Sequence, residues 1–144
     1  MLIRDFTPED SEKLLRLLQQ SPEAAQWPQA QLQPSTANGR NVLVALEHGQ
    51  AIGFLVLRCM AEQAEIENMA VAPQSRGKGI GMALVEEAIH DASDQGALEL
   101  FLEVRESNTA ARRLYERAGF IANGRRNRYY SSPDEDAVLY TRKL

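Results

Sequence analysis

Hydrophobic residues come in short, separate runs over the first half of the chain. The runs are rich in Val, Ile, Leu and Phe, which are typical of β-strands. We expect strands at residues 2–6, 41–46, 51–60 and 66–71. Only the four residues 47–50 separate the second run from the third, so these two strands are predicted to form a hairpin.

Two helix starts are predicted near the N-terminus. Thr7 and Pro8 fit the N-cap and the first helical position, and Asp10 closes a capping box before a leucine-rich stretch. A second helix start is predicted at residues 21–23. The polar, proline-containing segment 30–40 is predicted to be a surface loop.

The pattern changes to helical spacing in the middle of the chain. Apolar residues between Leu84 and Ala92 form one stripe with charged residues opposite, which predicts an amphipathic helix that ends at Gly96. Further on we expect a strand at 97–104, a helix at 109–118, and closing strands at 120–122 and 137–141. The pattern alone predicts an α/β fold with antiparallel strands.

Composition narrows the class of protein. A chain of 144 residues with 44% hydrophobic and 25% charged residues is expected to form one globular domain, residues 1–144. It has no apolar run of the ~20 residues that span a bilayer, and its start lacks a signal-peptide pattern, so we expect a cytoplasmic protein with no membrane association.

Charge and metal-ligand spacing exclude other classes. The net charge of −4 argues against nucleic-acid binding and would suit a cationic partner. His48 and His90 lie far apart, and the single cysteine, Cys59, is predicted to be a small core residue. We therefore predict no metal site.

A glycine-rich loop between a strand and a helix is the most informative segment. Three glycines, Gly77, Gly79 and Gly81, fall within five positions. The first N–H groups of a helix lack carbonyl partners, and glycines before them let an anion approach the backbone closely. With Arg76 and Lys78 alongside, this segment predicts a phosphate or pyrophosphate site; the alternative is a plain glycine turn before an ordinary helix.

The spacing of these glycines excludes two common phosphate motifs. A Walker A loop needs Ser or Thr after Gly-Lys, where this chain has Gly79. A dinucleotide fingerprint needs a third glycine where this chain has Met82 or Leu84. The pattern Q-x-x-G-x-G at residues 74–79 instead closely resembles the acetyl-CoA pyrophosphate loop of the GCN5-related N-acetyltransferase (GNAT) superfamily.

The resemblance extends over about the last half of the chain. The segments NMAVAPQSRGKGIG, LFLEVRESNTAARRLYERAGF and RRNRYYSSPDEDAVLYTRKL look like successive pieces of the ribosomal-protein-alanine N-acetyltransferase branch. This implies a mixed, mostly antiparallel twisted sheet of six to seven strands with about four helices, whose two central strands splay apart at the cofactor. The implied reaction is transfer of an acetyl group from acetyl-CoA to the N-terminal amine of a ribosomal or other protein.

Residue roles follow from the same resemblance. Glu103 would be the general base and Tyr115 the general acid, while Asn108 would contact the cofactor. Main-chain groups of Met69, Ala70 and Val71 would hold the acetyl and pantetheine portion. The pyrophosphate would lie on Arg76, Gly77, Lys78, Gly79, Ile80 and Gly81.

Each assignment has a plain alternative from the residues alone. Glu103 could be a solvated strand residue like Glu99, and Tyr115 could simply pack on a helix face. Trp27, Tyr129 and Tyr130 could line the acceptor cleft or belong to the core.

The basic stretch and the acceptor also remain open. The stretch at residues 125–128 could be a solvated turn or a contact with the ribosome. The first half departs from the branch, with Trp27-Pro28 where it carries an aromatic-Pro-Trp step, so the acceptor could instead be a lysine side chain or a small amine. A non-catalytic acetyl-CoA-binding module is a further alternative.

Overall fold

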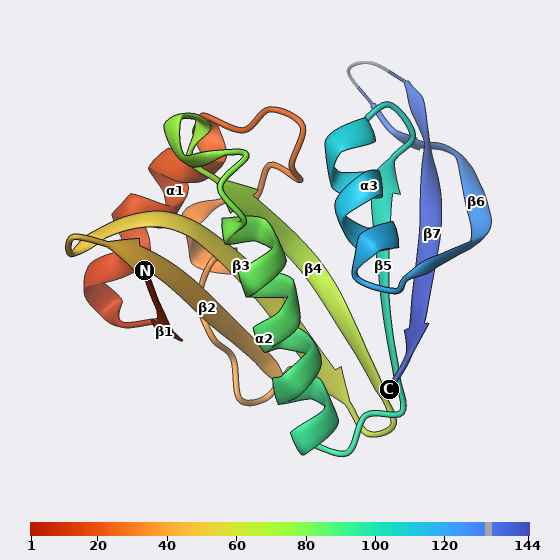
Figure 1. The fold of residues 1–144 in the computed structure, drawn as a ribbon, viewed down its shortest axis with the longest axis horizontal. Coiled ribbons are helices and arrows are strands. Elements are labelled where there is room, and N and C mark those ends of the chain that lie inside the picture. The colour runs from red at the N-terminus through yellow and green to blue at the C-terminus, as the bar shows by residue number, and fades with distance from the viewer. Residues whose placement is uncertain (132–133) are drawn as a thin grey trace.

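The computed structural model describes residues 1–131 and 134–144; Ser132 and Pro133, in the last segment that carries the resemblance, lie outside the described residues. In this part of the chain the fold comprises a seven-stranded sheet and three α-helices (Figure 1). The strands are β1 (Leu2–Asp5), β2 (Arg40–Glu47), β3 (Gln50–Met60), β4 (Gln63–Val71), β5 (Glu99–Arg105), β6 (Ile121–Tyr130) and β7 (Glu135–Lys143). The helices are α1 (Ser11–Gln19), α2 (Ile80–Asp94) and α3 (Thr109–Arg117).

The sheet is mixed, as predicted. Its strand order is β1-β2-β3-β4-β5-β7-β6, and every neighbouring pair is antiparallel except β4 with β5. The predicted hairpin is β2–β3. The single parallel pair arises because α2 connects β4 to β5 as a crossover.

Helices cover both faces of the sheet. One apolar core, which we call the α2-side core, contains residues of α2 and α3 such as Leu84, Val85 and Tyr115. The other, the α1-side core, contains Leu14 and Leu18 of α1. The predicted amphipathic helix, α2, therefore buries the apolar stripe that its sequence periodicity indicates.

The caps predicted at Thr7–Asp10 and at Gly96 are confirmed. The Asp10 carboxylate accepts a hydrogen bond from the Thr7 N–H at 2.8 Å, although a short 3₁₀ turn (Pro8–Asp10) precedes α1. Gly96 and Gly119 follow the last residues of α2 and α3 with φ of +90° and +91°, the left-handed conformation that glycine adopts without strain.

The predicted second helix, starting at residues 21–23, is wrong. This segment forms turns and then a 3₁₀ turn (Gln29–Gln31). The Gln26 amide folds back to donate to the carbonyls of Leu18, Ser21 and Ala24, and Pro28 is extended, so helical hydrogen bonds do not propagate. The described residues accordingly contain three α-helices where about four were predicted.

The basic stretch at residues 125–128 is solvent-exposed, but it lies within a strand, so the turn in the first of the two alternatives is wrong. It belongs to β6, which was expected to end at Ala122. The register of β6 on β7 shifts twice, and Arg128 in the second irregularity has φ of +50°. These bulges break the alternation by which the strand would be recognised in the sequence.

The two central strands separate along their length. The β4–β5 ladder contains only the pairs at Gln63, Ala64 and Glu65, although both strands continue beyond it. Figure 1 shows β4 and β5 close together at one end and apart at the other, where α3 and the loop before α2 lie. The splayed centre implied by the resemblance is therefore present.

Candidate active site

The glycine loop leads into α2 with its backbone accessible. Gly77 and Gly79 have φ of +75° and +83°, and Gly79 is the N-cap of α2. A Cβ atom at either position would meet nothing within 4 Å. The glycines are therefore required by backbone conformation, and the N–H groups that begin α2 lie beside open space.

Gly81 is required for a different reason. A Cβ atom there would lie 2.8 Å from Leu114 Cδ1 of α3. Because glycine has no Cβ atom, the first turn of α2 can approach α3 closely at Gly81.

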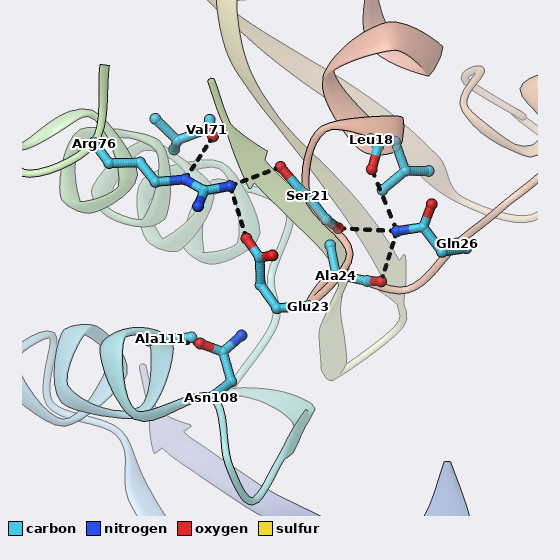
Figure 2. Close-up of polar contacts among 9 residues, drawn as sticks. All are labelled: Leu18, Ser21, Glu23, Ala24, Gln26, Val71, Arg76, Asn108 and Ala111. Atoms are coloured by element: carbon cyan, nitrogen blue, oxygen red, sulfur yellow. Dashed lines mark hydrogen bonds and ion pairs between the residues drawn. The ribbon is translucent and has the colours of Figure 1, made fainter. Parts of the chain in front are cut away.

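Arg76 binds the loop that follows α1. Its guanidinium donates to Glu23 Oε1 at 2.8 Å and to Ser21 Oγ at 3.0 Å, and its Nε donates to the Val71 carbonyl at 3.1 Å (Figure 2). The predicted cationic partner of the pyrophosphate is thus ion-paired to Glu23 in this structure. Sequence spacing could not show this contact, because the two residues are 53 positions apart.

One cleft of about 1060 Å³ brings the predicted site residues together. It runs from the glycine loop, along β4 and β5, to the last residues of β6. All the predicted site residues are among the described residues, and of these only Lys78 does not line the cleft. The others do: Met69, Ala70, Val71, Arg76, Gly77, Gly79, Ile80, Gly81, Glu103, Asn108 and Tyr115.

A bulge in β4 changes the direction of its side chains within this cleft. Leu57 pairs with Ile66 and Val56 with Asn68, so Glu67 is an extra residue. Ile66 lies in the α2-side core, whereas Ala70 lies in the α1-side core. Beyond Glu65, the backbone groups of β4 that face β5 have no strand partner.

Glu103 lies in a polar group at the end of β5. Its carboxylate is 3.0 Å from the Arg126 guanidinium, and its side chain is only 12% exposed. The charge of Glu103 raises the pKa of the Tyr129 hydroxyl. Glu103 is thus a largely buried residue of the cleft with a cationic partner, unlike a freely solvated strand glutamate.

Tyr115 lies in the wall of the cleft with its ring in the α2-side core. The ring packs edge-on against Phe120, with ring centres 5.7 Å apart, and is tilted against Tyr140 at 6.4 Å. Burial raises the pKa of its hydroxyl strongly. The phenol therefore keeps its proton at neutral pH.

Asn108 is the N-cap of α3. Its Oδ1 accepts from the Ala111 N–H at 3.2 Å (Figure 2). Because the oxygen is used in capping, only the side-chain NH₂ remains to donate to a ligand.

Three further polar residues of β4 that sequence reasoning missed line the cleft: Glu65, Glu67 and Asn68. Burial, together with Glu67 and Glu103, raises the pKa of Glu65 to about 6. Charged residues in a central strand were the available signal, since such a strand is normally apolar.

The aromatic residues left open by the sequence also line the cleft. Trp27 lies under the guanidinium of Arg40, which is 5.3 Å from the ring centre and 2.8 Å from the Glu67 carboxylate. Tyr129 and Tyr130 pack edge to face at the other end. Aromatic residues about 100 positions apart in the sequence thus line the same cleft.

Within residues 1–131 and 134–144, no group of three or more His, Cys, Asp or Glu side chains is arranged to hold a metal ion. No helix in this part of the chain is long and apolar enough to cross a membrane.

Comparisons with known proteins agree with this geometry. The model of the Acetyltransferase (GNAT) family matches residues 4–120. The ribosomal protein bS18-alanine N-acetyltransferase of Haemophilus influenzae is 34% identical over 133 residues, 90% of this chain and 90% of that protein.

Solved N-acetyltransferase and related structures also share the fold of this chain. The ribosomal-protein-S18-alanine N-acetyltransferase of Escherichia coli matches with a TM-score of 0.87 and 28% identity, covering 99% of this chain and 93% of that one. Ard1 from Thermoplasma volcanium matches with a TM-score of 0.85 and 28% identity, covering 99% and 97%. The splayed sheet, the glycine loop and these likenesses together identify the chain as an N-acetyltransferase that belongs to the Acetyltransferase (GNAT) family.

Proposed function

We propose that this enzyme transfers the acetyl group of acetyl-CoA directly to the N-terminal α-amine of a protein, most specifically an N-terminal alanine. The observation that carries the proposal is the single cleft that joins an anion-binding helix start to Glu103 and Tyr115. The H. influenzae and E. coli relatives, which are named for alanine of a ribosomal protein, support this acceptor. A ribosomal protein as acceptor would place the reaction in the cytoplasm, without a role for nucleic acid or membrane.

The co-substrate would bind along the splayed strands. Main-chain groups of Met69, Ala70 and Val71 would bond the pantetheine chain and polarise the thioester carbonyl, because β4 has no strand partner there on the side that faces β5. The pyrophosphate would lie at the start of α2, on the N–H groups of residues 76–81. Asn108 would donate its side-chain NH₂ to the same molecule.

The chemistry requires a base and an acid. Glu103, through a water molecule, would take a proton from the acceptor ammonium, and the free amine would attack the thioester carbonyl. Collapse of the tetrahedral intermediate forms the C–N bond and breaks the C–S bond. Tyr115 would give its proton to the departing thiolate; its buried phenol holds that proton until the thiolate forms.

Intact-mass analysis of two peptides with acetyl-CoA tests the acceptor. One peptide has a free N-terminal alanine and no lysine; the other has a blocked N-terminus and one internal lysine. We expect acetylation of the first alone. Acetylation of only the blocked peptide would make this a side-chain acetyltransferase, and cofactor binding without turnover of any amine would indicate a binding module.

A further inference from the structure

Three carboxylates line the acceptor side of the cleft, but only two have close cationic partners. Glu67 is 2.8 Å from the Arg40 guanidinium, and Glu103 is 3.0 Å from that of Arg126. Glu65, at the last paired position of the β4–β5 ladder, lines the same cleft but has no hydrogen bond or ion pair with any described residue. Arg58 and Arg126 act on it only from a greater distance.

The strand register places Glu65 beside Glu103. Glu65 pairs with Phe101 in the parallel ladder, and Glu103 is two residues further along β5. Their neighbours Ala64, Ile66, Leu102 and Val104 all lie in the α2-side core, so both carboxylates are on the opposite face. Strand geometry sets their Cα atoms about 8 Å apart. Both side chains line the same cleft at this spacing, so the pair can take a ligand that carries two cationic groups.

Asn68 provides a second, independent sign of a missing partner. It lines the same cleft and is only 5% exposed. Its Nδ2 donates to the Ala25 carbonyl at 2.9 Å, which fixes the amide, yet its Oδ1 has no hydrogen-bond partner among the described residues. A buried amide oxygen without a donor is costly, so the site fits a ligand that brings N–H groups.

We propose that Glu65, with Asn68, binds a second cationic group of the acceptor, the side chain of an Arg or Lys that directly follows the acetylated N-terminal residue. This rests on the proposed α-amine activity and adds to it a requirement for a basic second residue. The reacting amine lies near Glu103, and a long basic side chain on the next residue spans the separation between the two carboxylates. Arg supplies several N–H donors, which can bond a carboxylate and an amide oxygen together.

Two peptides with a free N-terminal alanine test this inference. They are identical except that residue 2 is arginine in one and citrulline, its neutral isostere, in the other. The readout is the ratio of their kcat/KM values in the wild type, in Glu65→Gln, and in Glu99→Gln. Glu99 lies on β5 opposite Gln63 but does not line the cleft. A ratio within each variant cancels any general loss of activity.

We expect the wild type and Glu99→Gln to prefer the arginine peptide by about fivefold at low salt, the effect of one partly screened charge pair. Glu65→Gln should reduce the preference to less than about twofold. Acetylation of both peptides with an unchanged ratio in Glu65→Gln would overturn the inference and leave the α-amine activity standing. Acetylation of neither peptide would overturn the proposed function itself.

Discussion

At the level of single residues, two tyrosines whose rings pack together, Tyr115 and Tyr140, have different roles. Tyr115 lines the cleft and its hydroxyl makes no hydrogen bond with a described residue. Tyr140 is fully buried; its hydroxyl donates to Glu116 Oε2 at 2.7 Å and accepts from Arg112 at 3.1 Å. The first hydroxyl is therefore available for chemistry, whereas the second stabilises the fold.

Replacing each by phenylalanine should separate these tasks. Tyr115→Phe is expected to lower kcat by about 100-fold, the usual contribution of a general acid, with little change in stability. Tyr140→Phe should lower the free energy of unfolding by about 1–2 kcal/mol and leave kcat almost unchanged. Steady-state kinetics and urea unfolding measure both quantities. Normal turnover by Tyr115→Phe would remove it from the mechanism.

Glu65 carries a cost in stability that depends on pH. Its pKa of about 6 in the folded state is above the ordinary value for glutamate, because burial and two neighbouring carboxylates disfavour its charge. The folded state therefore binds the proton more tightly than the unfolded state does. Protonation of Glu65 therefore favours the folded state. This contribution to stability is fully present at low pH and is lost as the pH rises through about 6.

Glu65→Gln should consequently stabilise the protein at neutral pH. We expect the free energy of unfolding to rise by about 1 kcal/mol at pH 7.5, a value reduced from the full shift because the group is only partly buried and solvent screens its charge. At pH 4 the difference should vanish. Urea titrations at the two pH values, with Glu99→Gln as a control, measure it; equal effects at both pH values would contradict a raised pKa.

At the level of elements, the start of α2 depends on a left-handed glycine. Gly79→Ala should cost about 1–2 kcal/mol through strain, and its Cβ would hold an anion away from the N–H groups. Gly49→Ala in the β2–β3 turn is the matched control, because Gly49 also has positive φ (+77°) and open space around it.

Calorimetry with CoA separates the two effects of the substitution. Both variants should lose similar stability, but only Gly79→Ala should weaken CoA binding, by at least about tenfold. Equal affinity in the two variants would show that the pyrophosphate lies elsewhere.

Periodic elements were predictable from the sequence, and irregular ones were not. α2 was predicted with its end at Gly96 because apolar spacing, glycine loop and cap agree. The segment after Ser21 was mistaken for a helix because Ser-Pro-Glu is a good helix start wherever tertiary contacts permit one. Here Arg76, 53 residues away, binds Glu23 and fixes a loop instead.

At the level of the whole molecule, the sheet is weakest where the reaction would take place. The two halves of the sheet, β1 to β4 and β5 to β7, share only a three-residue ladder between β4 and β5. The backbone of β4 beyond Glu65 therefore lacks partners on the side that faces β5. The sequence could not show this, since it depends on the divergence of two strands that are each ordinary. The resemblance to a family was the only guide.

Hydrogen exchange should reveal the unpaired backbone directly. In the free enzyme, amides of residues 66–71 that face β5 should exchange rapidly, while those of the β2–β3 pair stay protected. Adding CoA should slow exchange at the former by about tenfold or more and leave the latter unchanged. Unchanged exchange on β4 would contradict pantetheine binding there.

The gap between β4 and β5 also suggests how the enzyme could be inhibited. An exposed strand edge accepts an extended peptide as an additional strand. The unpaired groups of β4 form such an edge inside the cleft rather than at the rim of the sheet. A short extended peptidomimetic that pairs with β4 and ends in a basic group near Glu65 would therefore occupy the places of both substrates at once.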